Sequence, residues 1–164
     1  MNELFLSEFR TTLESASERL LEIPEAETEV ALGGEWSAKQ VLGHLIDSAA
    51  NNHARFVRAQ FKDDLVFEGY DGEAWVRVER FDQEAWVSLV DLWTNYNLHL
   101  LHVISNIPDD ILTKPRAKHS LDKIALRTVP ATESTTLEYL VRDYLEHLQE
   151  HLKQIFDGIA RIAK

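Results

Sequence analysis

The stretch LEYLVRDYLEHLQEHLKQI, residues 137–155, decides the fold of this chain of 164 residues. Its apolar side chains recur every three or four positions, which is the period of an α-helix that buries one face. His147 and His151 lie at the edge of this stripe, four residues apart, so both should point partly into the core. The stretch therefore predicts a long amphipathic helix packed against other helices. The apolar positions are Leu137, Leu140, Val141, Tyr144, Leu148, Leu152 and Ile155.

Two earlier segments have the same period. Residues 3–21 place an apolar side chain at every third or fourth position and end before Pro24. The second segment has the clearest helix start in the chain, because Ser37 and Gln40 form the two halves of a capping box. Its apolar stripe continues to about Phe61, which predicts a second long helix.

A third helix is expected to begin at the N-cap Asp82 and to run up to Pro108. The helix that contains residues 137–155 is expected to open at Thr135, with Glu138 as its capping-box partner. Four long amphipathic helices predict an all-α fold, a four-helix bundle with long crossover connections. The whole chain, residues 1–164, has the length of one domain.

Two polar connections separate these helices. The first contains Gly69 and Gly72 as helix breakers and a short helix around residues 73–78. The second, residues 108–134, contains three prolines and has no sustained helical period, and we expect residues 124–129 to be extended across the bundle. Connections of this length are uncommon in compact domains and are often functional.

Composition narrows the class of protein. The chain is 45% hydrophobic and 27% charged, as folded proteins are, and it has no cysteine, which excludes disulfides, thiolate metal sites and cysteine nucleophiles. Its formal net charge of -11 argues against nucleic acid as a partner. The N-terminal residues do not form a signal peptide, and no stretch reaches the roughly 20 apolar residues of a membrane span. We therefore expect a cytoplasmic protein.

The seven histidines suggest one metal site. His44 lies one turn after Val41 on the second helix, with the same relation to the apolar stripe as His147 and His151 on the last helix. Three imidazoles from facing helices hold one divalent ion and leave a coordination position open. The alternative is that the pair at 147 and 151 lies on the solvated surface, and that reading stays open on spacing alone.

The other histidines point less clearly to a site. His99 and His102 form a rival pair mainly off the apolar stripe of the third helix, which favours a surface position. His53 is expected to be exposed or hydrogen bonded, and His119 lies in the second connection. The chain contains no phosphate-binding glycine loop, Gly-x-Ser-x-Gly elbow or His-Glu-x-x-His motif.

Two motifs give the chain a family resemblance. The first is Trp36-Ser37 at the start of the second helix, followed by His44-Leu-Ile-Asp47. The second is Thr136-Leu-Glu-Tyr139, which leads to His147-x-x-x-His151-x-x-Gln154-Ile155. In their order and spacing these motifs resemble the DinB/YfiT-like superfamily over nearly the whole chain.

The resemblance implies a bundle with up-down-down-up topology and one divalent metal ion, zinc or nickel, near one end. It assigns the metal ligands to His44, His147 and His151. Characterised members of the superfamily include thiol-dependent S-transferases and a mycothiol-dependent isomerase, and others are described as metal-dependent hydrolases. Members are often homodimers, so a homodimer is expected here.

These observations lead to a functional hypothesis, a metal-dependent enzyme that acts on a small molecule, with a low-molecular-weight thiol as cosubstrate. Asp47, one turn beyond His44, is a candidate for orienting a ligand or relaying a proton, and Tyr144 for facing the same pocket. A solvated acid and a packed aromatic are the structural alternatives for these two residues. A metal-dependent hydrolase, a non-catalytic metal-containing binding module and a metal-free scaffold are the alternatives for the protein.

Overall fold

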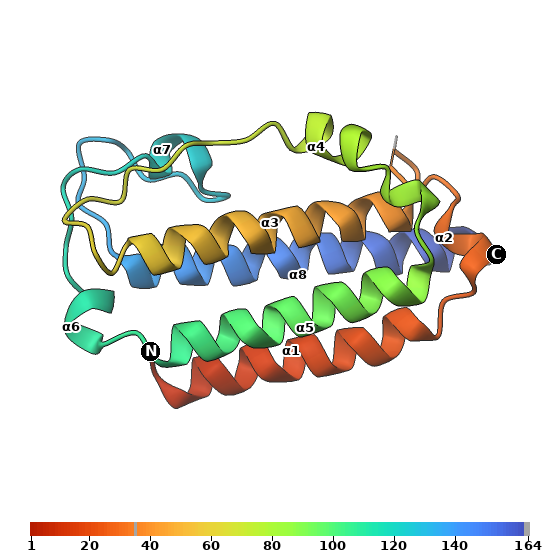
Figure 1. The fold of residues 1–164 in the computed structure, drawn as a ribbon, viewed down its shortest axis with the longest axis horizontal. Coiled ribbons are helices and arrows are strands. Elements are labelled where there is room, and N and C mark those ends of the chain that lie inside the picture. Colours follow the sequence, from red (N-terminus) through yellow and green to blue (C-terminus); the bar gives the residue numbers. More distant parts are fainter. Residues whose placement is uncertain (35, 163–164) are drawn as a thin grey trace.

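The computed structural model describes residues 1–34 and 36–162. In these residues four long helices lie side by side: α1 (Glu3–Leu21), α3 (Ala38–Arg58), α5 (Trp86–Ser105) and α8 (Leu137–Ile162) (Figure 1). The described part of the chain has isolated β-bridges but no strand, so the predicted all-α four-helix bundle is confirmed. The shorter elements are α2 (Glu25–Thr28), α4 (Gly72–Glu79), the 3-10 helix η1 (Phe81–Gln83), α6 (Asp109–Leu112) and α7 (Leu121–Ile124).

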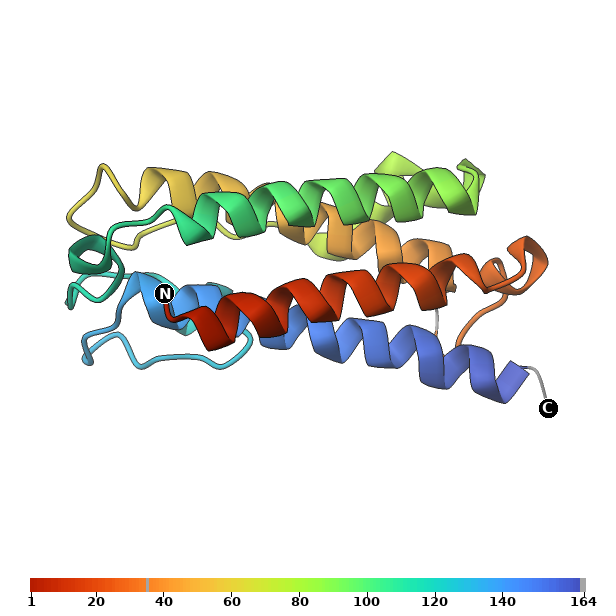
Figure 2. The same ribbon diagram turned by 90° about the horizontal axis from the view of Figure 1, so that it is seen from below.

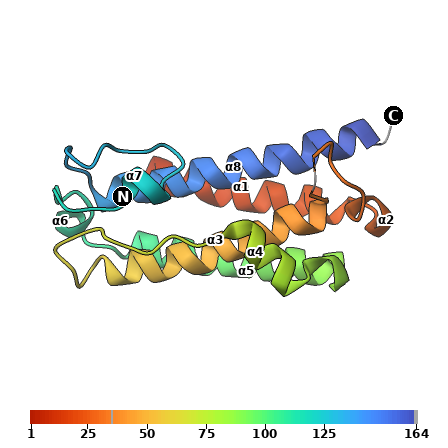
Figure 3. The ribbon, with the colours of Figure 1, turned by 90° about the horizontal axis from the view of Figure 1, so that it is seen from above.

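The four long helices have up-down-down-up topology. Helices α1 and α8 run in one direction and α3 and α5 in the other (Figures 1 and 2). Helix α3 packs against both α5 and α8, and α1 packs against the same two helices. Because α3 and α5 follow each other and run parallel, residues 59–85 must return along the whole bundle, and they do so outside α3 (Figure 3).

The apolar stripes read from the sequence form the core. Every apolar position predicted on α1 and on α8 is buried. Full burial of a Leu or Phe side chain contributes about 1.5–3 kcal/mol, so these stripes supply much of the free energy that holds the bundle together. None of the helices in the described residues is long and apolar enough to cross a membrane.

The start of α3 agrees with the prediction. The Ser37 N–H donates to Gln40 Oε1 at 2.9 Å, and the Gln40 N–H donates to Ser37 Oγ at 3.4 Å, which completes the capping box. The helix ends at Arg58 rather than near Phe61. The predicted short helix near residues 73–78 is α4.

The predicted start of the third long helix at Asp82 is wrong. The Asp82 carboxylate accepts from the guanidinium of Arg80, and Asp82 lies within η1. Helix α5 begins at Trp86, whose N–H donates to the Glu25 carboxylate at 3.0 Å. A side chain from α2, distant in sequence, therefore supplies the acceptor that a local N-cap residue normally provides. The helix also ends earlier than predicted, at residue 105.

The start of α8 differs by one residue from the prediction. Thr136 Oγ1 accepts from the Tyr139 N–H at 3.1 Å, which makes Thr136 rather than Thr135 the cap and leaves Glu138 outside a capping box. Thr135 instead exchanges backbone hydrogen bonds with Arg116. This pairing holds the second connection at the end of the bundle.

Residues 124–129 do not form the predicted extended segment across the bundle. Ile124 ends α7, and the chain then bends along α8. The N–H groups of Leu126 and Arg127 donate to the Asp143 carboxylate at 2.9 and 2.7 Å. A buried acid on α8 therefore decides the path of this segment.

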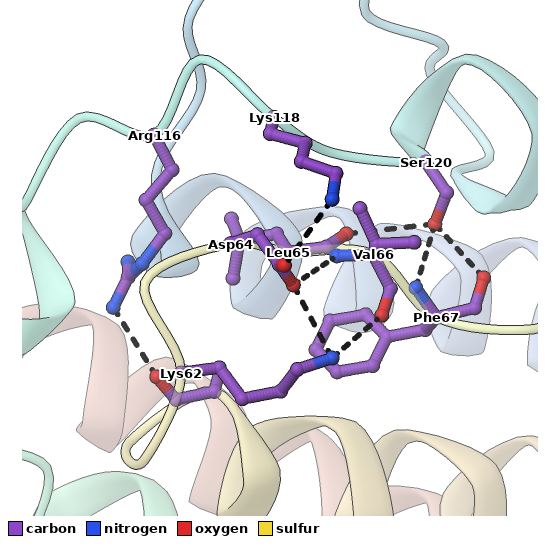
Figure 4. Close-up of polar contacts among 9 residues, drawn as sticks. Lys62, Asp64, Leu65, Val66, Phe67, Arg116, Lys118 and Ser120 are labelled. Carbon is purple, nitrogen blue, oxygen red and sulfur yellow. Dashed lines mark hydrogen bonds and ion pairs between the residues drawn. The ribbon is translucent and has the colours of Figure 1, made fainter.

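The two long connections are paired with each other (Figure 4). The Leu65 N–H donates to Lys118 O at 2.9 Å, and the Ser120 N–H donates to Leu65 O at 3.1 Å. The Ser120 hydroxyl also accepts from the Phe67 N–H at 2.9 Å. Arg116, which is buried, donates to Ala59 O and joins the second connection to the end of α3. Together the connections form a layer over α3 and α8.

The contact between α3 and η1 gives a prediction about stability. A Cβ on Gly43 would lie 2.1 Å from the Phe81 ring, so Gly43→Ala forces η1 away from α3. We expect the free energy of unfolding to fall by about 1–3 kcal/mol, as in other overpacked sites, although alanine favours helix. Denaturant unfolding measures the effect. Gly34→Ala, where the added methyl group meets no atom within 4 Å, is the control and should change little. Equal stabilities of the two variants would contradict the close contact.

Candidate metal centre

Three imidazoles meet between α3 and α8. His44 comes from the second turn of α3, and His147 and His151 come from successive turns of α8. One ring nitrogen of each lies within 4.8 Å of the other two. Among the residues that the structure describes, no other three histidine, aspartate or glutamate side chains come this close.

The spacing of the nitrogens fits one small ion. His44 Nε2 and His147 Nε2 are 3.3 Å apart. Two ligands at 2.0–2.1 Å from a tetrahedral zinc ion are separated by about 3.3 Å, so this pair already has the required spacing. The His151 ring is in edge contact with both other rings, at centroid distances of 4.8 and 4.6 Å. One of its nitrogens lies within 4.8 Å of both other ligand nitrogens.

Neighbouring side chains orient two of the three rings. His151 Nδ1 lies 2.8 Å from Gln154 Oε1, and His147 Nδ1 lies 3.5 Å from the Ser48 hydroxyl. If each Nδ1 carries the proton and donates it to its oxygen partner, both Nε2 atoms keep a free lone pair. This is the arrangement by which proteins orient histidine ligands of metals.

The imidazoles of His44 and His147 are neutral near pH 7. Burial lowers the pKa of His44 to about 4, and the proximity of His151 acts in the same direction. Burial, with His151 and His44 nearby, lowers the pKa of His147 to about 3. A neutral imidazole is the form that binds a metal ion. The donor set and its protonation therefore fit a divalent ion.

A cavity of about 210 Å³ adjoins the histidines. Helices α3 and α8 form its floor, and the two connections form its cover. Gly72, the first residue of α4, passes so close that a Cβ there would lie 3.1 Å from the His44 ring. The lining residues are His44, Ser48, Asn52, Arg55, Gly69, Tyr70, Gly72, Lys123, Ile124, Leu126, Leu140, Asp143, Tyr144 and His147.

Comparison with known proteins identifies the family. The sequence matches the DinB superfamily over residues 8–155, most of its length. The chain belongs to the DinB superfamily. A search of curated proteins found no match to this chain.

One solved structure matches the fold of this chain. YfiT from Bacillus subtilis, described as a probable metal-dependent hydrolase with an unusual four-helix bundle topology, superimposes with a TM-score of 0.76. The two sequences are 17% identical, and the match covers 99% of this chain and 90% of YfiT. The likeness establishes the topology.

Tyr144 lines the cavity, but contacts in the core hold its side chain in place. Its hydroxyl donates to Asn97 Oδ1 at 2.5 Å, and its ring is in edge contact with Phe9 and Phe56. Burial raises the pKa of Tyr144 far above its ordinary value. These contacts suit an anchor between α8 and α5 better than a group that exchanges protons with a substrate.

Asp47 is buried, with 3% of its surface exposed, and it does not line the cavity. Its Oδ2 atom has no hydrogen-bond partner among the described residues. Burial raises the pKa of Asp47 to about 7, and the charge of Glu79 and a hydrogen bond with it act in the same direction. Asp47 therefore faces α4 and keeps its proton up to about pH 7.

The remaining histidines lie away from the candidate centre. His53 Nδ1 is 3.4 Å from the Tyr96 hydroxyl, and its ring is in edge contact with His99. His99 and His102 are exposed on α5. His119 accepts from the Leu121 N–H and donates to Glu133 O, within the second connection.

Two cavity residues were not anticipated from the sequence. Tyr70 belongs to the first connection and stacks on His44 at a centroid distance of 6.4 Å. Arg55 lies on α3 and is buried. Arg55 had a readable signal, because His44, Ser48, Asn52 and Arg55 recur at intervals of four, four and three residues and so form a polar stripe on one helix face. Tyr70 had none, since it lies outside any periodic segment.

The raised pKa of Asp47 gives a prediction about pH and stability. Its folded pKa of about 7 exceeds the ordinary aspartate value of 3.8, so between these pH values the folded state holds a proton that the unfolded state has lost. This acid therefore makes stability fall as pH rises through that window. Asp47→Asn should stabilise the protein more at pH 8 than at pH 4, with a difference of roughly 2–4 kcal/mol.

Denaturant unfolding at the two pH values measures this difference. Asp91→Asn, an exposed substitution on α5, is the control and should change stability by less than about 0.5 kcal/mol. A pH-independent effect of Asp47→Asn would show that the carboxyl is not kept protonated by the fold.

Proposed function

We propose that this chain is a divalent-metal-dependent enzyme that acts on a small molecule, with His44, His147 and His151 as the metal ligands. One observation carries the proposal. His44 and His147 belong both to the imidazole cluster and to the wall of the adjoining cavity. A molecule bound in the cavity therefore lies against the same side chains that would hold the ion.

Zinc and nickel both suit three imidazoles. Held by three neutral ligands, such an ion keeps its full charge and lowers the pKa of a water or thiol, which is the chemistry that hydrolases and thiol transferases share. Gln154 and Ser48 lie where they can accept a proton from the Nδ1 atoms of His151 and His147, which would leave both Nε2 atoms free for the ion.

Two reactions are compatible with this site. A thiol-dependent S-transferase, with a low-molecular-weight thiol as cosubstrate, follows from the superfamily. A hydrolase is favoured by the shared fold with YfiT, itself described as a probable metal-dependent hydrolase. The same site without turnover would make the protein a metal-containing binding module.

The first test is metal content. His44→Ala, His147→Ala and His151→Ala should each lose most of the bound zinc or nickel, because two imidazoles hold a divalent ion far less tightly than three. Elemental analysis of the purified variants measures the loss. His102→Ala, which removes an exposed histidine on α5, should retain the metal content of the wild type. Unchanged metal in all three triad variants would mean that the ligands are assigned incorrectly.

Turnover distinguishes the reactions. Conversion of an electrophile only in the presence of a low-molecular-weight thiol indicates the transferase, and cleavage of esters or amides without thiol indicates the hydrolase. Either activity should disappear on chelation. A metal-loaded protein that is inert toward both panels would support the binding module.

Gln154 offers a sharper prediction. Gln154→Ala removes the acceptor that orients His151 and should weaken metal binding by about 10- to 100-fold, the usual cost of losing such a partner. Competition with a chromogenic chelator measures the affinity. Gln149→Ala is the matched control on the same helix, since Gln149 contacts Glu8 and Thr12 of α1 instead. Equal affinities of the two variants would remove Gln154 from the site.

The expected homodimer remains a prediction, and sedimentation of the purified protein would test it. It does not affect the site as proposed, because all three ligands come from one chain.

A further inference from the structure

Arg55 is a buried cation that projects into the cavity wall. Only 7% of its surface is exposed. One guanidinium nitrogen donates to Asn52 Oδ1 at 3.3 Å and another to Glu68 O at 3.0 Å. Arginine has five N–H donors, so three remain without an acceptor among the described residues.

No carboxylate balances this charge. Arg55 takes part in no ion pair with the residues that the structure describes, although the chain has 28 acidic residues. The exposed arginines Arg80, Arg127 and Arg142 each pair with an acid. Burying a charge without a partner is costly, so an unbalanced buried guanidinium is an unusual feature.

The second buried arginine shows the contrast. Arg116 donates to three main-chain carbonyls, those of Ile111, Lys114 and Ala59, and lies near the carboxylate of Asp63. Its contacts tie the connections to α3, although its Nε also lacks a partner among the described residues. Arg55 differs because its free donors lie in the wall of the cavity, where a ligand can reach them.

The other charged groups of the cavity do not neutralise Arg55. Asp143 lines the wall, but its two oxygens accept from the N–H groups of Leu126 and Arg127. Lys123 adds a second positive charge to the wall. A guanidinium stays protonated at any pH in which the protein is folded. The cavity is therefore positive within an acidic protein, and a divalent ion at the imidazoles would add to this charge.

The position of Arg55 relative to the imidazoles is set by α3. Arg55 lies eleven positions after His44, about 16 Å along the helix axis, and both lie on the same face. Helical side chains lean toward the N-terminus, so the long Arg55 side chain points back toward the His44 end. The cavity of about 210 Å³ lies between them and is smaller than the roughly 300–1,000 Å³ of sites for drug-sized ligands.

We propose that the substrate is a small anion and that Arg55 binds its carboxylate or phosphate group. The reacting end of the substrate then lies toward the imidazoles. That the bound anion is a substrate rests on the proposed function. A planar guanidinium matches the paired oxygens of both groups. Arg55 is the specificity-determining residue of the cavity.

Titration of the wild-type protein tests the proposal directly. Acetate, inorganic phosphate and the neutral analogue acetamide are added at constant ionic strength, and the Nε–H signal of Arg55 is followed by ¹⁵N NMR. Acetate or phosphate should produce a saturable shift of this signal and acetamide none, and comparison of the two anions identifies the preferred group. The absence of a saturable shift with either anion would overturn the proposal.

Variants provide the second readout. Arg55→Gln should weaken binding of the preferred anion by roughly 10- to 100-fold, the loss expected for a charge-assisted contact. Arg58→Gln, one turn further along α3 and exposed, is the matched control and should bind as the wild type does. Arg55→Lys keeps the charge and should bind with intermediate affinity. Undiminished binding by a folded Arg55→Gln variant would contradict the assignment, and if that variant does not fold, the wild-type titration decides.

Metal-free and zinc-loaded samples separate this inference from the proposed function. Anion binding at Arg55 in a protein that takes up no metal would defeat the proposed function and leave the anion site standing. Stoichiometric zinc without any response at Arg55 would defeat the anion site and leave the metal centre standing.

Discussion

The contact between α3 and α8 is the constraint on which the rest of the structure depends. Both helices bring polar side chains to their contact, and three half-buried imidazoles meet between them. Such groups are stable in a core only when each has a partner or a ligand. Ser48 and Gln154 satisfy one nitrogen of His147 and of His151, while His44 Nδ1 has no partner among the described residues. Helices α1 and α5 supply the apolar packing that holds this polar contact in place.

The topology explains why a cavity forms beside these groups. Two consecutive long helices run parallel, so the chain between α3 and α5 has to cross the outside of the bundle. It passes over the imidazole cluster at Gly72 and pairs with the second connection through Leu65 and Ser120. The resulting layer closes a small space above the polar stripe of α3. A buried arginine at one end and an imidazole cluster at the other give that space its chemical character.

Sequence patterns predicted the helices correctly where the residues that form each helix boundary or stripe are close together in the chain. The stripe of α1, the capping box of Ser37 and the apolar face of α8 all appear as expected. The start of α5 was misplaced because its acceptor, Glu25, comes from another helix. In the same way, Asp143 decides the path of residues 125–127 from a position on α8. A spacing rule cannot detect a hydrogen-bond partner that becomes adjacent only in the folded chain.

The sequence by itself determined the four amphipathic helices, the placement of His147 and His151 on the same face of one helix, and the polar stripe that runs from His44 to Arg55. These features depend on the 3.6-residue period, which any helix imposes on its own side chains. Only the tertiary structure decided that His44 meets the pair on α8, that Tyr70 and Lys123 help to enclose the cavity, and that Arg55 forms no ion pair with the described residues. Those relations join residues far apart in the chain, and they depend on which helices cross and where the connections run.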